Sequence, residues 1–280
     1  GVGGKHESGM FRASGASEWF RNNPIPYSEG LNIELAKMQL GTLGSGNHFV
    51  EVCIDQTDRV WVVLHSGSRG IGYSIANIFI KKATIENTYE LEDQNLAGLR
   101  GSSFELYIEM MQWAQRYACA NREFMMEAAL SDIQLVVSGL KEEDRINCHH
   151  NFAVRECHFG KEVWLTRKGA IKAYVGDFGI VPGSMGDHTY ITQGLGNQDS
   201  YMSSAHGAGR RYSRRAAKRN FSVRSLEKHM EGKVWNIKDA KALLDEHPEA
   251  YKPISQVMSD QQDLATVIHT LTQILNYKGT

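Results

Sequence analysis

The chain contains 280 residues, 41% of them hydrophobic, which is enough to bury a sizeable core in one large domain or two small ones. Its 31 basic and 32 acidic side chains nearly cancel. This balance excludes a global electrostatic field that would draw the protein to nucleic acid or to a membrane, so any polyanion must be bound by a local patch.

The four cysteines form neither a CxxC pair nor a short disulfide framework, which favours free thiols in a reducing compartment. No apolar run approaches the ~20 residues that span a bilayer. The opening GVGGKHESGMF also lacks the basic and apolar regions of a signal peptide. We therefore expect a cytoplasmic protein with no membrane segment.

The first half of the chain alternates short strand patterns with longer helical ones. Residues 47–54 and 59–64 are rich in β-branched and aromatic side chains, and the DQTD between them predicts a hairpin-like link. Apolar residues recur at three- and four-residue spacing over 71–85 and 104–130, which predicts two helices. The Met and aromatic stripe of the second helix is interpreted as core.

The second half is expected to begin with strands and to end in helices. Strands are predicted at 162–166 and 171–175, on either side of a turn at RKGA, and helices from about residue 213 to the end. No repeat, low-complexity tract or linker interrupts the chain. We therefore predict an α+β fold in which residues 1–280 form a single domain, with mixed strands and packed helices around a central metal or nucleotide site.

Four histidine-containing segments have glycine-, serine- or amide-rich surroundings that a buried structural histidine does not need. They hold His48 in GSGNHFVE, His65 in VLHSGSRG, His149 and His150 in NCHHNFA, and His206 in SSAHGAGRR. None has the local spacing of a structural zinc site. A lone histidine is more typical of a core or surface position, but four such segments together favour a joint metal or nucleotide site.

A metal ion bound by neutral imidazoles alone would keep its charge uncompensated, so a carboxylate or thiolate is expected among its ligands. By proximity in the sequence, the candidates are Glu51, Asp177, Asp187 and Cys148. Each of them taken alone is more typical of a surface, loop or core residue.

A run of basic side chains follows His206 in the stretch GAGRRYSRRAAKRNF. On a helix, Arg211, Arg214, Arg215 and Lys218 would share one face. Such a run is usually solvated, but its position directly after His206 indicates that it could neutralise phosphates. The sequence therefore predicts a polyanionic substrate.

Eight motifs occur in the order in which the RtcB family of RNA-splicing ligases carries them, so the chain resembles that family from Gly1 to Gly279. They are GTLGSGNHFVEV, LHSGSRGIG, INCHHN, TRKGA, PGSMG, GLGN, SAHGAGR and a terminal YKG. Eight ordered motifs are far more specific than any one of them.

The resemblance implies an RNA ligase that uses GTP and Mn²⁺, with two Mn²⁺ ions in the intact enzyme. It would join an RNA end bearing a 3′-phosphate or 2′,3′-cyclic phosphate to a 5′-hydroxyl end, as in tRNA splicing and RNA repair. His206 would attack the α-phosphate of GTP and carry the guanylyl group. His48, His65 and His150 would bind metal, with His149 as a neighbour.

The resemblance also implies two sets of binding residues. The guanosine contacts would be Asn47, Glu51, Asn151, Pro182, Ser184, Met185, Thr189, Ala208, Gly209 and Lys278. The RNA phosphates would be held by Arg210, Arg211, Arg214, Arg215 and Lys218. Thr189 stands where a serine is expected and keeps the hydroxyl. The implied partners are GTP and RNA ends such as tRNA halves, and an activating protein is left open.

One segment of the family is not found in this sequence. Upstream of the matched region, family members carry an Asp-Xaa-Xaa-Cys segment that supplies a carboxylate to one metal and a bridging thiolate to both. A glycine-rich loop at residue 1 without an initiator methionine is also typical of a cut chain. We therefore expect a fragment of a longer protein that binds metal weakly and is inactive on its own.

Two other functions stay open for the same residues. A metal-dependent phosphohydrolase would use the histidines to activate water, but the paired carboxylates of two-metal hydrolases are not evident. A non-enzymatic RNA-end-binding fragment would use only the basic helix. Neither explains why HGAGR, GNHFVE, HHN and YKG occur together, so the ligase interpretation is preferred.

Overall fold

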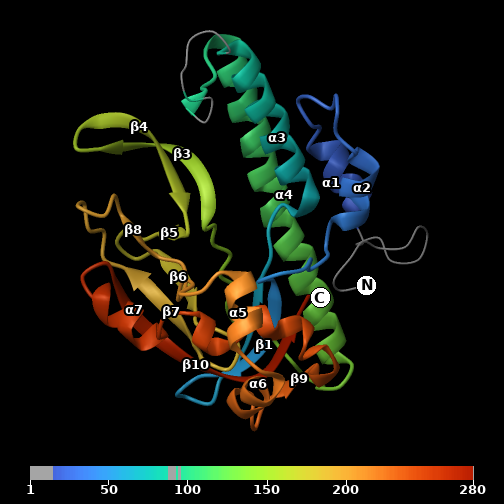
Figure 1. The fold of residues 1–280 in the computed structure, drawn as a ribbon, viewed down its shortest axis with the longest axis vertical. Coiled ribbons are helices and arrows are strands. Elements are labelled where there is room, and N and C mark those ends of the chain that lie inside the picture. Colours follow the sequence, from blue (N-terminus) through green and yellow to red (C-terminus); the bar gives the residue numbers. More distant parts are fainter. Residues whose placement is uncertain (1–14, 88–92, 94–95, 280) are drawn as a thin grey trace. The chain divides into compact units, whose positions relative to one another are not determined.

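The computed structural model describes residues 15–87, 93 and 96–279, and the chain forms two compact units (Figure 1). Unit 1 comprises Gly1–Gly44 and Ser66–Leu140, and unit 2 comprises Ser45–His65 and Lys141–Thr280. The glycine-rich opening of the sequence lies outside the described residues. Helices and antiparallel sheets occur together, which confirms the predicted α+β class. The prediction of a single catalytic domain stays a prediction.

Unit 1 is helical. It contains α1 (Ala16–Asn22), α2 (Ile33–Gln39), α3 (Arg69–Glu86) and α4 (Gly101–Gln134). The two long helices run side by side in Figure 1. They confirm the helices predicted at 71–85 and 104–130, and the bounds of α4 extend a few residues beyond the predicted ones at each end.

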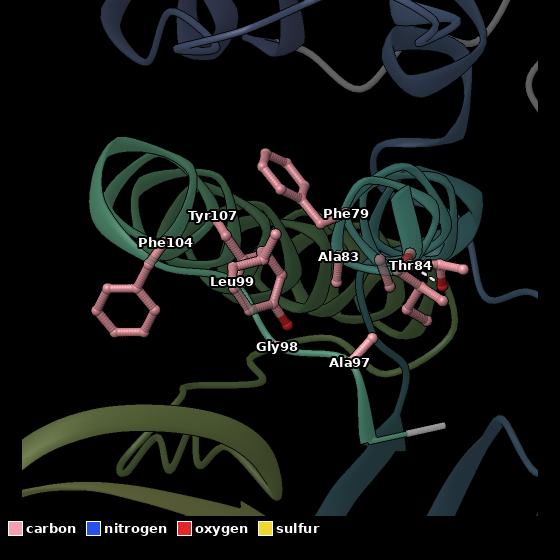
Figure 2. Close-up of a pocket in the computed structure, with 10 residues that line it drawn as sticks. Phe79, Ala83, Thr84, Ala97, Gly98, Leu99, Phe104 and Tyr107 are labelled. Carbon is pink, nitrogen blue, oxygen red and sulfur yellow. Dashed lines mark hydrogen bonds between the residues drawn. The ribbon is translucent and has the colours of Figure 1, made fainter. Parts of the chain in front are cut away.

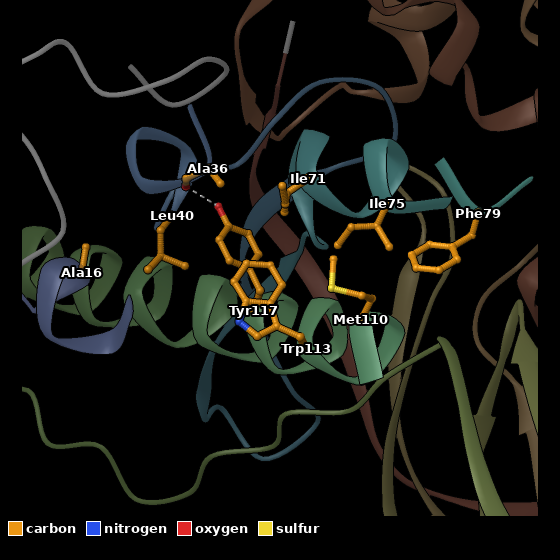
Figure 3. Packing of buried hydrophobic residues seen from close by; sticks show 9 residues of the cluster. All are labelled: Ala16, Ala36, Leu40, Ile71, Ile75, Phe79, Met110, Trp113 and Tyr117. Carbon is orange, nitrogen blue, oxygen red and sulfur yellow. Dashed lines mark hydrogen bonds between the residues drawn. The ribbon is translucent and has the colours of Figure 1, made fainter. Parts of the chain in front are cut away.

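The core of unit 1 lies along one face of α4. Met110, Trp113 and Tyr117 follow one another at three- and four-residue spacing and are at most 1% exposed. They pack against Leu40 at the end of α2 and Ile75 of α3, as Figure 3 shows. The Tyr117 hydroxyl donates to the carbonyl of Ala36 at 2.7 Å. The interpretation of this stripe as core is therefore confirmed.

A pocket of unit 1 opens between α3, α4 and the segment 97–99 (Figure 2). Its walls are mostly apolar, with Phe79, Leu99 and Phe104 among them, and Tyr107 is its one titratable side chain among the described residues. The described lining thus contains no His, Cys, Asp or Glu side chain. No described helix combines the length and the apolar character needed to cross a membrane.

Unit 2 is built on one mixed sheet. Its strands follow the order β2 (Val60–His65), β1 (Phe49–Ile54), β10 (Ala265–Lys278), β7 (His188–Gly194) and β6 (Phe178–Pro182), and β9 (Val234–Trp235) also pairs with β10. All pairs are antiparallel except β9 with β10. The hairpin predicted around DQTD is confirmed.

The helical prediction for the end of the chain is wrong over residues 265–278, which form β10 in the middle of this sheet. Its sequence, ATVIHTLTQILNYK, is rich in β-branched residues, which favour a half-buried strand. The helices α5 (Arg214–Asn220), α6 (Val223–His229) and α7 (Ile254–Asp260) agree with the prediction from residue 213 onwards. Between α6 and α7 lie 3₁₀ turns η2 (Ile237–Asp239), η3 (Ala242–Glu246) and η4 (Pro248–Ala250).

Two small sheets complete unit 2. Strand β3 (Asn151–His158) pairs with β4 (Lys161–Lys168), which contains the strand predicted at 162–166. Strand β5 (Ala170–Lys172) covers only the start of the strand predicted at 171–175. It pairs with β8 (Ser203–Ala205) and not with β4, because Gly169 turns the chain away at φ +73°.

Asn121 is a polar side chain in the interior of unit 1, and we predict that it contributes strongly to stability. It is 0% exposed, and its amide bonds Gly41, Thr42, Ser66 and Gly67 on the segments next to the unit boundary. Asn121→Ala would leave these buried groups unpaired and lower the free energy of unfolding by about 2–4 kcal/mol, measured by urea titration.

The matched control is Glu109→Ala, on an exposed position of the same helix, which should change the free energy of unfolding by less than about 0.5 kcal/mol. A loss below about 1 kcal/mol for Asn121→Ala would show that water or movement of the loops replaces its hydrogen bonds.

Candidate active site

Unit 2 brings four of the singled-out histidines together at the ends of its strands. His48 precedes β1, His65 ends β2, His150 precedes β3 and His206 follows β8. Ring centroids are 5.7 Å apart for His48 and His65, and 4.6 Å apart for His65 and His150. His150 and His206 stack at 5.0 Å with an interplanar angle of 6°. The four imidazoles thus form one continuous cluster.

His65 lies at the centre of this cluster. Burial holds its pKa well below the ordinary value, and His150, His48, His206 and Lys278 lower it further. Its imidazole is therefore neutral near pH 7, which is the form that binds a metal ion. The amide nitrogen of Asn47 lies 3.5 Å from His65 Nε2.

The cluster alone does not complete a metal site. Among the described residues, no three His, Cys, Asp or Glu side chains are arranged to hold a metal ion. The four anionic candidates have other surroundings: Glu51 accepts from Asn276, Asp177 pairs with Lys172, Asp187 accepts from Ser184, and Cys148 packs in an apolar cluster. The donors gathered here are imidazoles, so a hard cation would need anionic ligands in addition.

Gly169 fixes the orientation of His206. His206 Nδ1 lies 2.7 Å from the Gly169 carbonyl oxygen, to which it donates, so the lone pair is on Nε2. The Gly169 amide donates in turn to the carbonyl of His150 at 2.9 Å. Burial lowers the pKa of His206 and Lys168 lowers it further, while the bond to Gly169 raises it. His206 therefore presents a neutral imidazole with a fixed tautomer.

A buried arginine anchors the turn that carries Gly169. The side chain of Arg167 is 1% exposed and makes two 2.9 Å bonds to the Glu156 carboxylate on β3. It also donates to Ser203 Oγ at the start of β8, three residues before His206. Arg167 therefore ties β4 to both β3 and β8, and this explains the arginine in the TRKGA motif.

Glu51 lies on β1 in a buried polar network. It is 2% exposed and accepts from Asn276 Nδ2 at 2.8 Å and from Thr189 Oγ1 at 3.4 Å. Burial raises the pKa of Glu51 to about 8, although Lys278 and the hydrogen bonds oppose this. Two residues expected to contact guanosine, Glu51 and Thr189, are therefore in contact with each other.

The PGSM and HGAG segments, although distant in sequence, are also adjacent. The amide of Ala208 donates to the carbonyl of Pro182 at 3.1 Å. A Cβ at Gly207 would lie 3.0 Å from the same carbonyl oxygen, a tight contact, so the close approach favours glycine. Met185 in the first loop is 1% exposed. The fold thus places next to each other the two loops that are expected to contact guanosine.

Glu246 pairs through its carboxylate with several cations of the candidate site. Its buried carboxylate accepts from Lys278 Nζ at 3.1 Å, from Arg210 at 3.2 Å and from the Tyr251 hydroxyl at 2.6 Å, and it pairs with Arg214 at 3.1 Å. Lys278 is 7% exposed, with Nζ 5.3 Å from the Phe49 ring centroid. The terminal lysine of the YKG motif is therefore held in place by an internal carboxylate.

The basic run divides into members with an ion pair and members without one, although Arg214 and Lys218 keep 43% and 51% of their side chains exposed. Arg214 and Lys218 reach Asp245 at 2.7 and 3.4 Å, and Arg210 bonds Glu246. Arg211 and Arg215 are exposed and make no ion pair within the described part of the chain. Arg211 lies outside α5, which begins at Arg214, so the predicted single helical face holds only for Arg214, Arg215 and Lys218.

Other expected residues lie in the same unit without a described contact to the histidines. Asn151 begins β3 next to His150 and is exposed, and Gly209 is an exposed glycine at φ +70° directly after Ala208. Their place in the sequence brings them near the cluster, and their roles stay predictions.

Sequence reasoning missed five residues that support this site: Gly169, Glu156, Glu246, Gln273 and Asn276. The TRKGA motif was a signal for the first of them. The others lie in segments whose sequence is typical of ordinary strands, turns or helices, and their partners are distant in the chain, so no local pattern marks them.

Comparison with known proteins identifies the family. A family model described as tRNA-splicing ligase RtcB matches residues 19–279. The RNA-splicing ligase RtcB of Escherichia coli K12 is 45% identical over 254 residues, which cover 86% of this chain and 61% of that protein. The tRNA-splicing ligase RtcB of Nanoarchaeum equitans is 31% identical over 270 residues, 81% of this chain and 57% of that protein.

A third relative, the RNA-splicing ligase RtcB homolog 1 of Entamoeba histolytica, is 29% identical over 287 residues, 86% of this chain and 54% of that protein. The chain thus spans between 54% and 61% of the length of these three relatives. The family match covers most of the chain and includes all four clustered histidines. The chain belongs to the RtcB family of tRNA-splicing ligases.

Proposed function

We propose that this chain carries the nucleotidyl-transfer site of a GTP- and Mn²⁺-dependent RNA ligase. The enzyme would join RNA 3′-phosphate or 2′,3′-cyclic phosphate ends to 5′-hydroxyl ends. The observation that carries the proposal is His206, whose Nδ1 is held by the Gly169 carbonyl inside a cluster of imidazoles. The names of the relatives, which are RNA-splicing and tRNA-splicing ligases, support the substrate class.

The first step proposed is attack of His206 Nε2 on the α-phosphorus of GTP. A P–N bond forms, the bond from the α-phosphorus to the bridging oxygen breaks, and pyrophosphate leaves. Because Nδ1–H donates to Gly169, the nucleophilic lone pair is on the nitrogen that can face the phosphate. The pKa of His206 lies below its usual value, so the imidazole does not have to lose a proton first.

The later steps move the guanylyl group to RNA. A 2′,3′-cyclic phosphate end would first be hydrolysed by water to a 3′-phosphate with a free 2′-hydroxyl. An oxygen of the RNA 3′-phosphate attacks the same phosphorus and the P–N bond breaks, which restores His206 and leaves a pyrophosphate-linked guanylate on the RNA end. The 5′-hydroxyl then attacks the RNA phosphorus, GMP leaves with the bridging oxygen, and the hydroxyl proton passes to solvent. His206 acts in the first two exchanges and not in the last.

His48, His65 and His150 would hold Mn²⁺, which neutralises charge on the phosphates when it is bound. Their clustered imidazoles suit this role, and the anionic ligands would come from the family's Asp-Xaa-Xaa-Cys segment. The guanosine contacts would come from residues of this chain. Glu51, Thr189 and Lys278 would contact guanosine, and the loop with Ser184 and Met185 would line its site.

The exposed part of the basic run would bind RNA phosphates. Arg210 and Arg214 make ion pairs with internal carboxylates, so we assign them mainly to a structural role in the site. Arg211 and Arg215, which are exposed, are better placed to exchange solvent for phosphate oxygens.

Labelling with α-³²P-GTP and Mn²⁺ tests the nucleotide-transfer proposal. Label that is acid-labile and survives denaturation is expected on the wild-type chain when it is supplied with the family's Asp-Xaa-Xaa-Cys segment, and not on His206→Ala, because only Nε2 of His206 forms the P–N bond. His149→Ala is the control and should keep the label. The assay is run on the chain alone and on the chain supplied with a polypeptide that carries the family's Asp-Xaa-Xaa-Cys segment.

Label on the chain alone would contradict the expectation that a fragment is inactive. Label that requires the added segment would support it. The absence of label from both wild-type samples would contradict nucleotidyl transfer and favour the RNA-end-binding alternative.

Gly169→Ala tests how His206 is positioned. A Cβ at Gly169 would make an ordinary contact with His206 Cε1 at 3.4 Å, but alanine rarely adopts the backbone φ of +73°. Relaxation of this strain would shift the Gly169 carbonyl and, with it, the His206 imidazole that it holds. Displacing the imidazole should slow labelling at saturating GTP by about 100-fold. Gly160→Ala is the matched control, because Gly160 has the same φ and open space around it. Equal losses in the two variants would attribute the effect to backbone strain and not to His206.

The double variant Arg211→Ala/Arg215→Ala tests RNA binding. Affinity for a 3′-phosphorylated single strand should fall, and the slope of log K against log salt should decrease by about 0.7 for each RNA phosphate that the variant no longer binds. Filter binding at several KCl concentrations measures this, with exposed Arg224→Ala in α6 as the control. An unchanged slope would place the RNA phosphates elsewhere.

A further inference from the structure

Strand β10 contains a bulge opposite β1. The register shifts between Val52 and Cys53, so that Ile274 has no counterpart on β1. Residues three apart in a regular strand face opposite sides of the sheet, and the extra residue of a bulge cancels one alternation. Gln273 and Asn276 therefore face the same side, and Asn276 Nδ2 lies 3.4 Å from Gln273 Oε1.

Asn276 holds the carboxylate of Glu51. It lies directly opposite Glu51 in the β1–β10 pair and donates to Glu51 Oε1 at 2.8 Å. Asn276 is 2% exposed, and its Oδ1 has no hydrogen-bond partner among the described residues. An unpaired buried acceptor is unfavourable, so fold stability alone does not account for an asparagine here. Its amide is oriented by the carboxylate.

Gln273 holds the loop that follows β6. Its Oε1 accepts from the amide of Gly186 at 2.7 Å, and its Nε2 donates to the carbonyl of Ser184 at 3.2 Å. The two bonds bracket Met185 between them. Gly186 adopts φ +89°, so the loop geometry that Gln273 holds is one that favours glycine.

We infer that Gln273 and Asn276 are positioning residues that set the base selectivity of the nucleotide site. Together they hold Glu51 and the Ser184–Gly186 loop in one arrangement. The inference rests on the proposed function, in which Glu51 contacts the guanine base. A purine with a 6-oxo group presents N1–H as a donor to a carboxylate, whereas adenine presents an unprotonated N1 whose lone pair would oppose it.

This discrimination requires Glu51 to be ionised, because a protonated carboxyl could donate to adenine N1. Burial raises the pKa of Glu51, whereas the charge of Lys278 and the hydrogen bond from Asn276 lower it and favour the ionised form. The bond from Asn276 therefore both orients the carboxylate and supports the discrimination.

The test compares Asn276→Leu and Gln273→Met, which keep side-chain size but remove the amides. Thr272→Val, at an exposed position of the same strand, is the control. Rates of His206 labelling are measured against GTP and ATP concentration, with the chain alone and with the added Asp-Xaa-Xaa-Cys polypeptide. Loss of a charge-assisted hydrogen bond should raise KM for GTP about 10- to 100-fold in Asn276→Leu. The maximal rate should change little, and the preference for GTP over ATP should fall by a similar factor.

Displacement of a fluorescent GTP analogue by GTP or ATP gives a second readout that requires no chemistry. Circular dichroism melts verify that each variant folds. Binding of GTP without labelling would overturn the transfer proposal, while the selectivity of binding would still test the inference. Retained preference for GTP in both folded variants, or equal losses for GTP and ATP, would overturn the inference and leave the proposed function intact. A wild-type chain that binds no nucleotide would overturn both.

Discussion

The hydrogen bond from His206 Nδ1 to the carbonyl of Gly169 organises the candidate active site. It fixes which imidazole nitrogen carries the lone pair, and the carbonyl that accepts the hydrogen bond belongs to a residue at φ +73°, a conformation that favours glycine. The amide of Gly169 bonds His150, so one peptide positions both a metal-binding candidate and the nucleophile candidate. The buried Arg167–Glu156 pair supports that peptide, because removal of either partner would leave an uncompensated charge.

Ion pairs with internal carboxylates leave only some cations of the basic run available to bind a ligand. Glu246 and Asp245 engage Lys278, Arg210, Arg214 and Lys218, although the run of arginines in the sequence gives no sign of this. The paired cations are held in fixed positions with part of their charge compensated. Arg211 and Arg215 have no ion pair among the described residues, and the proposed function assigns them to RNA phosphates.

The final strand completes the site from the far end of the chain. β10 lies between β1 and β7, and its pairing places Lys278 opposite Phe49, more than two hundred residues earlier in the chain. Its bulge directs Gln273 and Asn276 to the same side as Glu51. Because these contacts join distant segments, the site forms only when the sheet is complete, and folding of unit 2 requires costly long-range pairing.

The family resemblance, the four histidine segments, the first hairpin and the two long helices follow from the sequence alone. Each of these depends on local motifs and spacing, which period and composition report directly. The folded structure is needed to show that 265–278 is a strand, that Gly169 orients His206, and which arginines are paired. Residues far away in the chain decide whether a strand lies at the edge or in the centre of a sheet. They also decide which group bonds a buried amide and whether a charge is compensated. No local pattern encodes them, because the free energy of a buried polar group is set by its neighbours in space.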